Sequence, residues 1–210
     1  DPTHVTDLKK RLNEEGTEYA TYRVAANDYS LIHSLEKNGF ILVDGLITLE
    51  TMLGADKIEL PFVKVATEED SKKVIDLSSK VFRGISRYYN DSVIPTEKAD
   101  TIYQQWMRNS LTGKVADRVL IWKEKESILG FITVQKKGQI PLVGVTENAR
   151  GKGVGKGLIK AALAQCKIWG LRKVRIETQM TNVVALRLYH SCGFKIIDTS
   201  LTFRWHASLA

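Results

Sequence analysis

The feature that most restricts the fold is a glycine-rich turn between an apolar stretch and a helix. In Arg150-Gly151-Lys152-Gly153-Val154-Gly155, glycines stand at alternate positions directly after the predicted strand that ends at Val145. Glycines this closely spaced let the backbone curl so that successive N–H groups point toward an oxyanion. A helix beginning there adds the partial positive charge of its N-terminus. The turn therefore predicts a pyrophosphate site, which Arg150, Lys152 and Lys156 would reinforce. A glycine-rich turn without a ligand is the alternative.

Two common phosphate-binding motifs do not fit this segment. A P-loop ends in Gly-Lys-Ser/Thr, whereas Gly155-Lys156 is followed by Gly157. The dinucleotide fingerprint Gly-x-Gly-x-x-Gly matches at Gly151 and Gly153 but has Lys156 in place of its third glycine, and it would follow the first strand of the chain. The sequence therefore disfavours both a P-loop and a Rossmann domain.

The rest of the chain alternates short strands and amphipathic helices, which is typical of an α/β protein. Thr67, with Asp70 three residues later, predicts a capped helix start. Helices are expected over 28–38, 68–82, 100–109, 155–170 and 182–191, and strands over 18–24, 40–44, 46–49, 118–122, 128–134, 140–145, 174–178, 194–197 and 201–205.

The two ends of the chain resemble each other. Gly39-Phe40 and Asp44 align with Gly193-Phe194 and Asp198 without a gap, and the order strand, helix, strand, strand is the same in both segments. Each glycine follows a helix, where a left-handed cap favours a residue without Cβ. This pattern indicates a degenerate internal duplication, in which the first copy has Leu35 where the second has Tyr189.

Composition narrows the class of protein. The chain has 210 residues, of which 43% are hydrophobic and 26% charged, so disorder is excluded, and no apolar run reaches the ~20 residues of a membrane helix. Two cysteines cannot form a disulfide framework or a zinc site, which favours a reducing cytoplasm. The net charge of +7 suits an anionic partner or solubility alone, and nucleic acid is the least favoured partner.

The segment from Arg150 to Gly155 also fits the pattern Arg/Gln-x-x-Gly-x-Gly/Ala, which resembles the coenzyme A signature of the GNAT N-acetyltransferase superfamily. This resemblance implies a GNAT α/β fold with a mixed, splayed central sheet, plus an abbreviated N-terminal GNAT-like half. It implies a truncated region over 1–57 and an acetyltransferase domain over 58–210. It also implies acetyl-CoA as the acyl donor and no metal.

The resemblance assigns the donor site to particular residues. The pantetheine arm would lie between the strand around Leu142, Val143 and Val145 and the strand over 174–178, as an added strand would. Asn182 would contact that arm, although Asn is also a common helix N-cap. Tyr189, two helical turns later, would protonate the departing thiolate of coenzyme A. The alternative is that Tyr189 is only an aromatic residue of the core. The expected cofactor-binding residues are Leu142, Val143, Val145, Arg150, Gly151, Lys152, Gly153, Val154, Gly155, Lys156 and Asn182.

Further segments resemble the dTDP-fucosamine acetyltransferase group of that superfamily. They include the stretches 177–182 and 203–206 and the segment Ser86-Arg87-Tyr88-Tyr89-Asn90, where Tyr88-Tyr89 departs from the expected Phe-His. In the segment 86–90, the guanidinium group could form an ion pair with a diphosphate, and the aromatic rings could stack on a nucleotide base. The expected substrate-binding residues are Arg87, Tyr88, Tyr89 and Tyr103, whereas Trp106 is more typical of a helix core. No general base is assigned, and Glu177 could equally be a solvated strand residue.

These observations predict a cytoplasmic enzyme that transfers acetyl to the amino group of a dTDP-linked 4-amino-sugar by direct attack. Its expected partner is this small molecule, with no nucleic acid and no membrane, and a homodimer is left open. Acetyl transfer to another amine, such as a peptide N-terminus or a polyamine, is the first alternative. A non-catalytic coenzyme A-binding module is the second.

Overall fold

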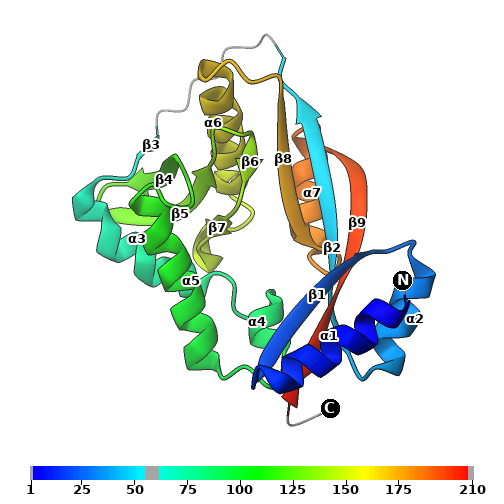
Figure 1. The fold of residues 1–210 in the computed structure, drawn as a ribbon. Helices are drawn as coiled ribbons and strands as arrows, with labels where there is room; N and C mark the ends of the chain where they lie inside the picture. Colours follow the sequence, from blue (N-terminus) through cyan, green and yellow to red (C-terminus); the bar gives the residue numbers. More distant parts are fainter. Residues whose placement is uncertain (1, 55–61, 208–210) are drawn as a thin grey trace. The chain divides into compact units, whose positions relative to one another are not determined.

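The computed structural model describes residues 2–54 and 62–207. These residues form two compact units (Figure 1), of which the first comprises 2–47, 179–181 and 198–207 and the second comprises 48–178 and 182–197. The predicted domain boundary between residues 57 and 58 lies outside the described residues. Both units are discontinuous in sequence, because β2 (Ile41–Met52) and β9 (Lys195–His206) run from one unit into the other.

The first unit packs two helices on an antiparallel strand pair. It contains α1 (Pro2–Glu14), β1 (Tyr19–Ala25), α2 (Tyr29–Lys37) and parts of β2 and β9. β1 pairs with the end of β9 from Tyr19↔His206 to Ala25↔Ser200. Its apolar cluster consists of Val5, Leu12, Val24, Ile32, Leu35, Phe40, Phe203 and Trp205. The sequence analysis did not foresee α1.

The second unit is built on two sheets. Strands β3 (Val63–Val65), β4 (Arg118–Glu124), β5 (Ser127–Val134) and β7 (Val143–Val145) form an antiparallel sheet in that order. β6 (Gln139–Ile140) instead pairs in parallel with β8 (Lys173–Gln179) in the other sheet. The predicted mixed α/β fold is confirmed.

Helices cover both faces of the antiparallel sheet. α3 (Glu68–Lys80) and α5 (Thr96–Leu111) pack against the face that carries Val119, Ile121 and Phe131. α6 (Val154–Ile168) packs on the opposite face, close to Gly130. The remaining helices are α4 (Arg87–Asn90), the short 3₁₀ turn η1 (Glu147–Ala149) and α7 (Val183–Ser191).

Three predicted strand boundaries are wrong. The expected strand over 140–145 is two strands, β6 and β7, because Pro141 lacks an N–H and Leu142 is held by Thr133 of β5. The expected pairs of strands over 40–49 and over 194–205 are single strands, β2 and β9. Gly45 and the polar run after Asp198 resemble turn signals locally, but pairing in the folded protein overrides them.

The structure supports the internal duplication. The strand, helix and strand of the first repeat have 7, 9 and 12 residues, as do those of the second. Asp28 and Asn182 cap the two helices by accepting from the N–H three residues later, at 3.1 and 3.2 Å. Gly39 and Gly193, at φ 82° and 86°, follow the two helices. Each unit therefore combines strands from both repeats.

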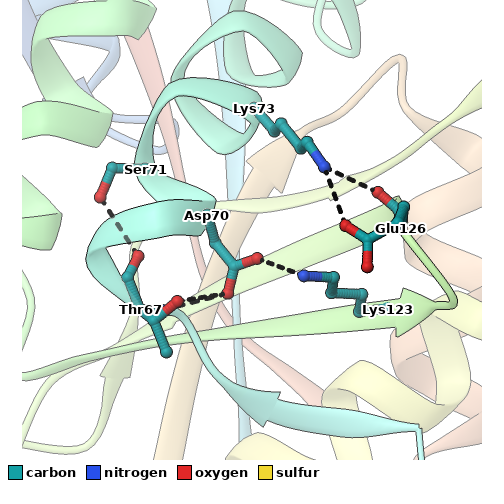
Figure 2. A network of polar contacts seen from close by, with 6 residues as sticks. All are labelled: Thr67, Asp70, Ser71, Lys73, Lys123 and Glu126. Atoms are coloured by element: carbon teal, nitrogen blue, oxygen red, sulfur yellow. Dashed lines mark hydrogen bonds and ion pairs between the residues drawn. The ribbon is translucent and has the colours of Figure 1, made fainter.

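The start of α3 is fixed by the buried carboxylate of Asp70 (Figure 2). Its Oδ2 accepts from the backbone N–H and the hydroxyl of Thr67, at 3.2 and 3.0 Å, and its Oδ1 accepts from Lys123 Nζ at 2.9 Å. Burial alone would raise the pKa of Asp70, but the hydrogen bonds from Lys123 and Thr67 outweigh it and lower this pKa to about 2. The Thr67–Asp70 spacing predicted this capped helix start, and the contact with Lys123, which joins the helix to β4, comes from the structure alone.

We expect Asp70→Asn to lower the free energy of unfolding by about 2–4 kcal/mol at pH 7, because Lys123 loses its counter-charge. In the wild type this contribution is fully present above about pH 4 and is lost as the pH falls toward 2, since the folded pKa lies below that of an unfolded aspartate. Urea titrations at several pH values would measure both effects.

Glu126→Gln is the control, because Glu126 pairs with Lys73 at 3.4 Å on the exposed surface (Figure 2) and such pairs contribute little. Equal losses in the two variants would contradict a special role of the buried carboxylate.

Candidate active site

The glycine-rich turn has the geometry of an anion site. Gly151 and Gly153 have φ of 75° and 83°, in the left-handed region, and Gly153 is the N-cap of α6. Within the described part of the chain, five amides of the turn and first helical turn donate to no protein acceptor, namely those of Gly151, Gly153, Val154, Gly155 and Lys156. The side chains of Arg150, Lys152 and Lys156 are exposed beside them. Unpaired amides, a helix N-terminus and basic side chains together suit a phosphate or diphosphate.

β7 presents its polar backbone groups in two directions. Leu142 donates its N–H to Thr133 Oγ1 at 2.9 Å and accepts from the Thr133 N–H at 2.9 Å, so its backbone is already occupied. Hydrogen-bonded and non-hydrogen-bonded pairs alternate in an antiparallel ladder, which places the N–H and C=O of Val143 and Val145 on the side away from β5. Of the three strand residues predicted to bind the pantetheine arm, these two therefore offer free backbone groups.

β7 and β8 belong to different sheets. β6, just before β7, pairs with β8 at Gln139↔Arg175 and Ile140↔Ile176, and after Pro141 the chain pairs with β5 instead. The two strands therefore diverge from a junction at residues 140–142. This is the splayed arrangement that the sequence analysis expected.

α7 carries the predicted proton donor. Tyr189 is 5% exposed, with its ring centroid 6.1 Å from that of Phe194, and its hydroxyl makes no hydrogen bond to another described residue. Burial, and secondarily the nearby Cys192, raise the pKa of Tyr189 above its usual range. The phenol therefore stays protonated at neutral pH, as a proton donor must.

The start of α6 lies against α7. A Cβ at Gly155 would stand 3.0 Å from Leu188 Cδ2, so only glycine leaves the present spacing undisturbed. Burial raises the pKa of the Cys192 thiol, and the charges of Lys156 and Lys160 oppose this rise, which places both lysines near the end of α7. The glycine-rich turn and the helix of Tyr189 are thus neighbours within one unit.

Asn182 has a structural role whether or not it binds a ligand. Its Oδ1 accepts from Ala185 N–H at 3.2 Å and its Nδ2 donates to Thr178 Oγ1 at 3.1 Å. The N-cap alternative is therefore confirmed, and contact with the acyl donor stays a prediction.

Of the four predicted acceptor residues, Tyr103 is buried and the other three are partly buried. Tyr103 is 4% exposed, and its ring stacks against Phe82 and Tyr89 with centroids 4.4 and 5.9 Å apart. The Tyr89 hydroxyl lies 2.7 Å from Ser79 O and 2.6 Å from Asp100 Oδ1. These contacts give both tyrosines a role in the core of this unit, and their binding of substrate stays a prediction.

Arg87 and Tyr88 lie next to this core. Arg87 Nη2 donates to the Tyr88 hydroxyl at 2.9 Å, and the guanidinium carbon lies 4.3 Å from the Tyr88 ring centroid. Arg87 Nη1 is buried and donates to no described residue. An unpaired buried donor of this kind is costly, and an anionic ligand would relieve the cost.

The sequence analysis missed a cavity of about 310 Å³ in the second unit, which Gln135, Gln139 and Arg175 help to line. The available signal was the alternation in β8, where Arg175 and Glu177 are exposed between buried neighbours. Across residues 2–54 and 62–207, no cluster of His, Cys, Asp or Glu could hold a metal ion, and no helix has the length and apolarity needed to cross a membrane.

Comparison with known proteins identifies the family. The model of the acetyltransferase (GNAT) family matches residues 81–194, which are more than half of the chain. The chain therefore belongs to the acetyltransferase (GNAT) family.

Two curated relatives are each 26% identical to the chain over 85% of its length. One is the spore coat polysaccharide biosynthesis protein SpsD of Bacillus subtilis (strain 168), of which the chain covers 63%, so it spans less than two thirds of that relative. The other is the dTDP-fucosamine acetyltransferase of Escherichia coli O6:H1, of which the chain covers 77%. A solved GCN5-related N-acetyltransferase from Sphaerobacter thermophilus shares the fold, with a TM-score of 0.64 and 16% identity. The alignment covers 90% of this chain and 59% of that chain.

We expect Asn182→Ala to lower the free energy of unfolding by about 1 kcal/mol, because α7 loses its cap. If Asn182 also contacts the acyl donor, the variant should bind acetyl-CoA about tenfold more weakly. A tenfold change corresponds to about 1.4 kcal/mol of binding free energy. Asp28→Ala removes the equivalent cap of α2 and is the matched control. Equal acetyl-CoA affinity in the two variants, measured by calorimetry, would leave Asn182 with a capping role alone.

Proposed function

We propose that the chain transfers the acetyl group of acetyl-CoA to the amino group of a dTDP-linked 4-amino-sugar. The observation that carries the donor half is the row of unpaired amides at the start of α6, next to the helix of Tyr189. The acceptor half rests on the similarity to a dTDP-fucosamine acetyltransferase and to a protein of spore coat polysaccharide biosynthesis.

In this proposal the second unit holds the donor in an extended conformation. The five unpaired amides between Gly151 and Lys156 bind the diphosphate, and Arg150, Lys152 and Lys156 add positive charge. Val143 and Val145 hydrogen-bond the pantetheine arm through the backbone groups that face away from β5, as an added strand would. Acetyl-CoA supplies an activated thioester, so the protein needs only to align it with an amine.

Two groups of the protein then assist the transfer. The N–H of Val145 polarises the thioester carbonyl. The Tyr189 hydroxyl donates its proton to the sulfur as the amine lone pair forms the new C–N bond and the C–S bond breaks. The acylated nitrogen then releases its surplus proton to solvent, and the Tyr189 phenolate regains a proton from solvent. Because both reactants are held in one orientation, proximity supplies most of the rate enhancement.

Two contacts of Arg87 support a role for this residue in binding the nucleotide of the acceptor. The buried, unpartnered Nη1 of Arg87 suits a diphosphate oxygen, and the guanidinium carbon already lies 4.3 Å from the Tyr88 ring centroid. Arg87 and Tyr88 would therefore bind the nucleotide diphosphate, with Tyr103 and Tyr89 supporting the Tyr88 ring from the core.

The direct test is coenzyme A release and product mass with acetyl-CoA and a panel of amines. We expect turnover with a dTDP-linked 4-amino-sugar, and Tyr189→Phe should lower kcat by about 10²- to 10⁴-fold without changing acetyl-CoA affinity. Because its pKa is raised, Tyr189 should not lose its proton below about pH 10. Tyr29→Phe, which removes an exposed hydroxyl from α2, is the control.

Three outcomes would change the proposal. Turnover of a peptide or polyamine but of no nucleotide-sugar would replace the acceptor. Unchanged kcat in Tyr189→Phe would remove the proton donor. Acetyl-CoA binding without turnover of any amine would favour a non-catalytic binding module.

A separate prediction concerns the anion site itself. Gly153→Ala places a Cβ at φ 83°, which costs about 1–2 kcal/mol, although no atom lies within 4 Å of that Cβ. We expect the turn to rearrange and acetyl-CoA to bind about tenfold more weakly. This change corresponds to about 1.4 kcal/mol of binding free energy.

Gly170→Ala is the matched control, because Gly170 has φ 75°, equally free space and a place at the other end of α6. Thermal unfolding should report similar losses of stability in the two variants. Equal acetyl-CoA affinities in calorimetry would contradict the anion site.

A further inference from the structure

A cavity of about 310 Å³ in the second unit is not used by the donor site described above. The residues that matter for its chemistry are Trp106, Gln135, Gln139, Pro141, Arg175 and Glu177. Its volume lies at the lower end of the range for small-molecule sites, roughly 300–1,000 Å³. It combines an aromatic ring with two carboxamides, a guanidinium and a carboxylate, which suits a small, hydroxylated ring with a charged group.

Two of the polar side chains are held in place by other residues. Arg175 Nε donates to Glu50 Oε2 at 2.7 Å, and Glu50 also pairs with Lys173 at 3.3 Å, so the guanidinium is fixed at the start of β8. Gln135 Nε2 donates to Val115 O, which orients the carboxamide, while its Oε1 is buried and accepts from no described residue. An unsatisfied acceptor on a residue that lines the cavity favours a ligand that brings hydroxyl or ammonium donors.

The cavity adjoins the junction where β7 and β8 diverge. Pro141 lies between β6 and β7, and Glu177 lies on β8 just beyond the β6–β8 pairing. Trp106 comes from α5, which covers one face of the antiparallel sheet, whereas the unpaired amides of the turn belong to the start of α6 on the other face. A ligand in the cavity and a donor on the turn would therefore approach the junction from opposite faces.

A row of rings leads from Arg87 to the cavity. The centroids of Tyr88 and Tyr103 are 6.0 Å apart, and those of Tyr103 and Trp106 are 6.1 Å apart. The buried Tyr103 ring thus connects the Tyr88 ring, which Arg87 contacts, to the Trp106 ring in the cavity wall.

We infer that the cavity binds the amine-bearing ring of the acceptor, with Glu177 as the residue that binds its ammonium group. Trp106 packs against the apolar face of the ring, and Gln135 and Gln139 hydrogen-bond its hydroxyls. Glu177 thus selects an amine over a hydroxyl at the reacting position, and the amine gives up a proton to solvent before its lone pair attacks. The inference rests on the proposed acetylation of an amine and adds the residues that recognise it.

The test compares Glu177→Gln with wild type and with Glu97→Gln, a variant of an exposed acid in the first turn of α5 that lines no part of the cavity. Calorimetry on the full chain with coenzyme A present would measure affinity for a dTDP-linked 4-amino-sugar and for its 4-hydroxy counterpart. Wild type and Glu97→Gln should prefer the amine by about tenfold, as expected for one hydrogen bond to a charged group.

Glu177→Gln should lose this preference and raise KM for the amine by a similar factor, with a smaller change in kcat and an unchanged acetyl-CoA affinity. A preference equal to that of wild type would overturn the inference.

A second measurement separates this inference from the proposed function. Galactosamine should shift the indole N–H resonance of Trp106, assigned with Trp106→Phe, in wild type and less in Glu177→Gln. Such a shift without turnover of any nucleotide-sugar would remove the dTDP acceptor and retain the amine site. No shift in wild type, together with turnover of the nucleotide-sugar, would retain the function and overturn the site.

Discussion

The hydrogen bonds between Thr133 and Leu142 decide how the second unit can work. By tying Leu142 to β5 through both N–H and C=O, they carry the chain away from β8 directly after the short parallel pairing at Gln139–Ile140. Pro141, which lacks an N–H, makes the change of partner easy. As a result Val143 and Val145 keep backbone groups without a strand partner on one side, and the chain continues into the turn that holds the five unpaired amides. Both elements of the donor site follow from this change of partner.

The internal duplication explains why so small a chain can support such an opening. Each unit joins strands of both repeats: Ala207 N–H donates to Glu18 O at 3.0 Å, and the equivalent Leu53 N–H donates to Arg172 O at 2.9 Å. The two copies keep the same cap, helix length and left-handed glycine, which are requirements of folding. They differ where chemistry is proposed, since Leu35 is fully buried in an apolar cluster and Tyr189 keeps a polar hydroxyl.

Local signals were sufficient for some features and misleading for others. The cap of α3, the helix after the glycine-rich turn and the strand order of the repeats were predictable, because each depends on residues close in sequence. The break at Pro141–Leu142 was not, since the partner that claims Leu142 comes from β5. Tyr89 and Tyr103 gave no local signal that their rings would stack against each other, and their binding of substrate stays a prediction. Gln135 and Arg175 gave no signal of a shared cavity, because their sequence separation hides their proximity.

The sequence by itself determined the family and the local conformation of the glycine-rich turn, because glycines at left-handed positions act through the local backbone alone. It also determined the duplication, which survives as an ungapped match. Only the tertiary structure decided which backbone groups stay free and which side chains share a cavity. The burial that raises the pKa of Tyr189 also arises only in the folded protein. These properties depend on which strand pairs with which and on how much solvent remains around each group, and neither is encoded in any short segment.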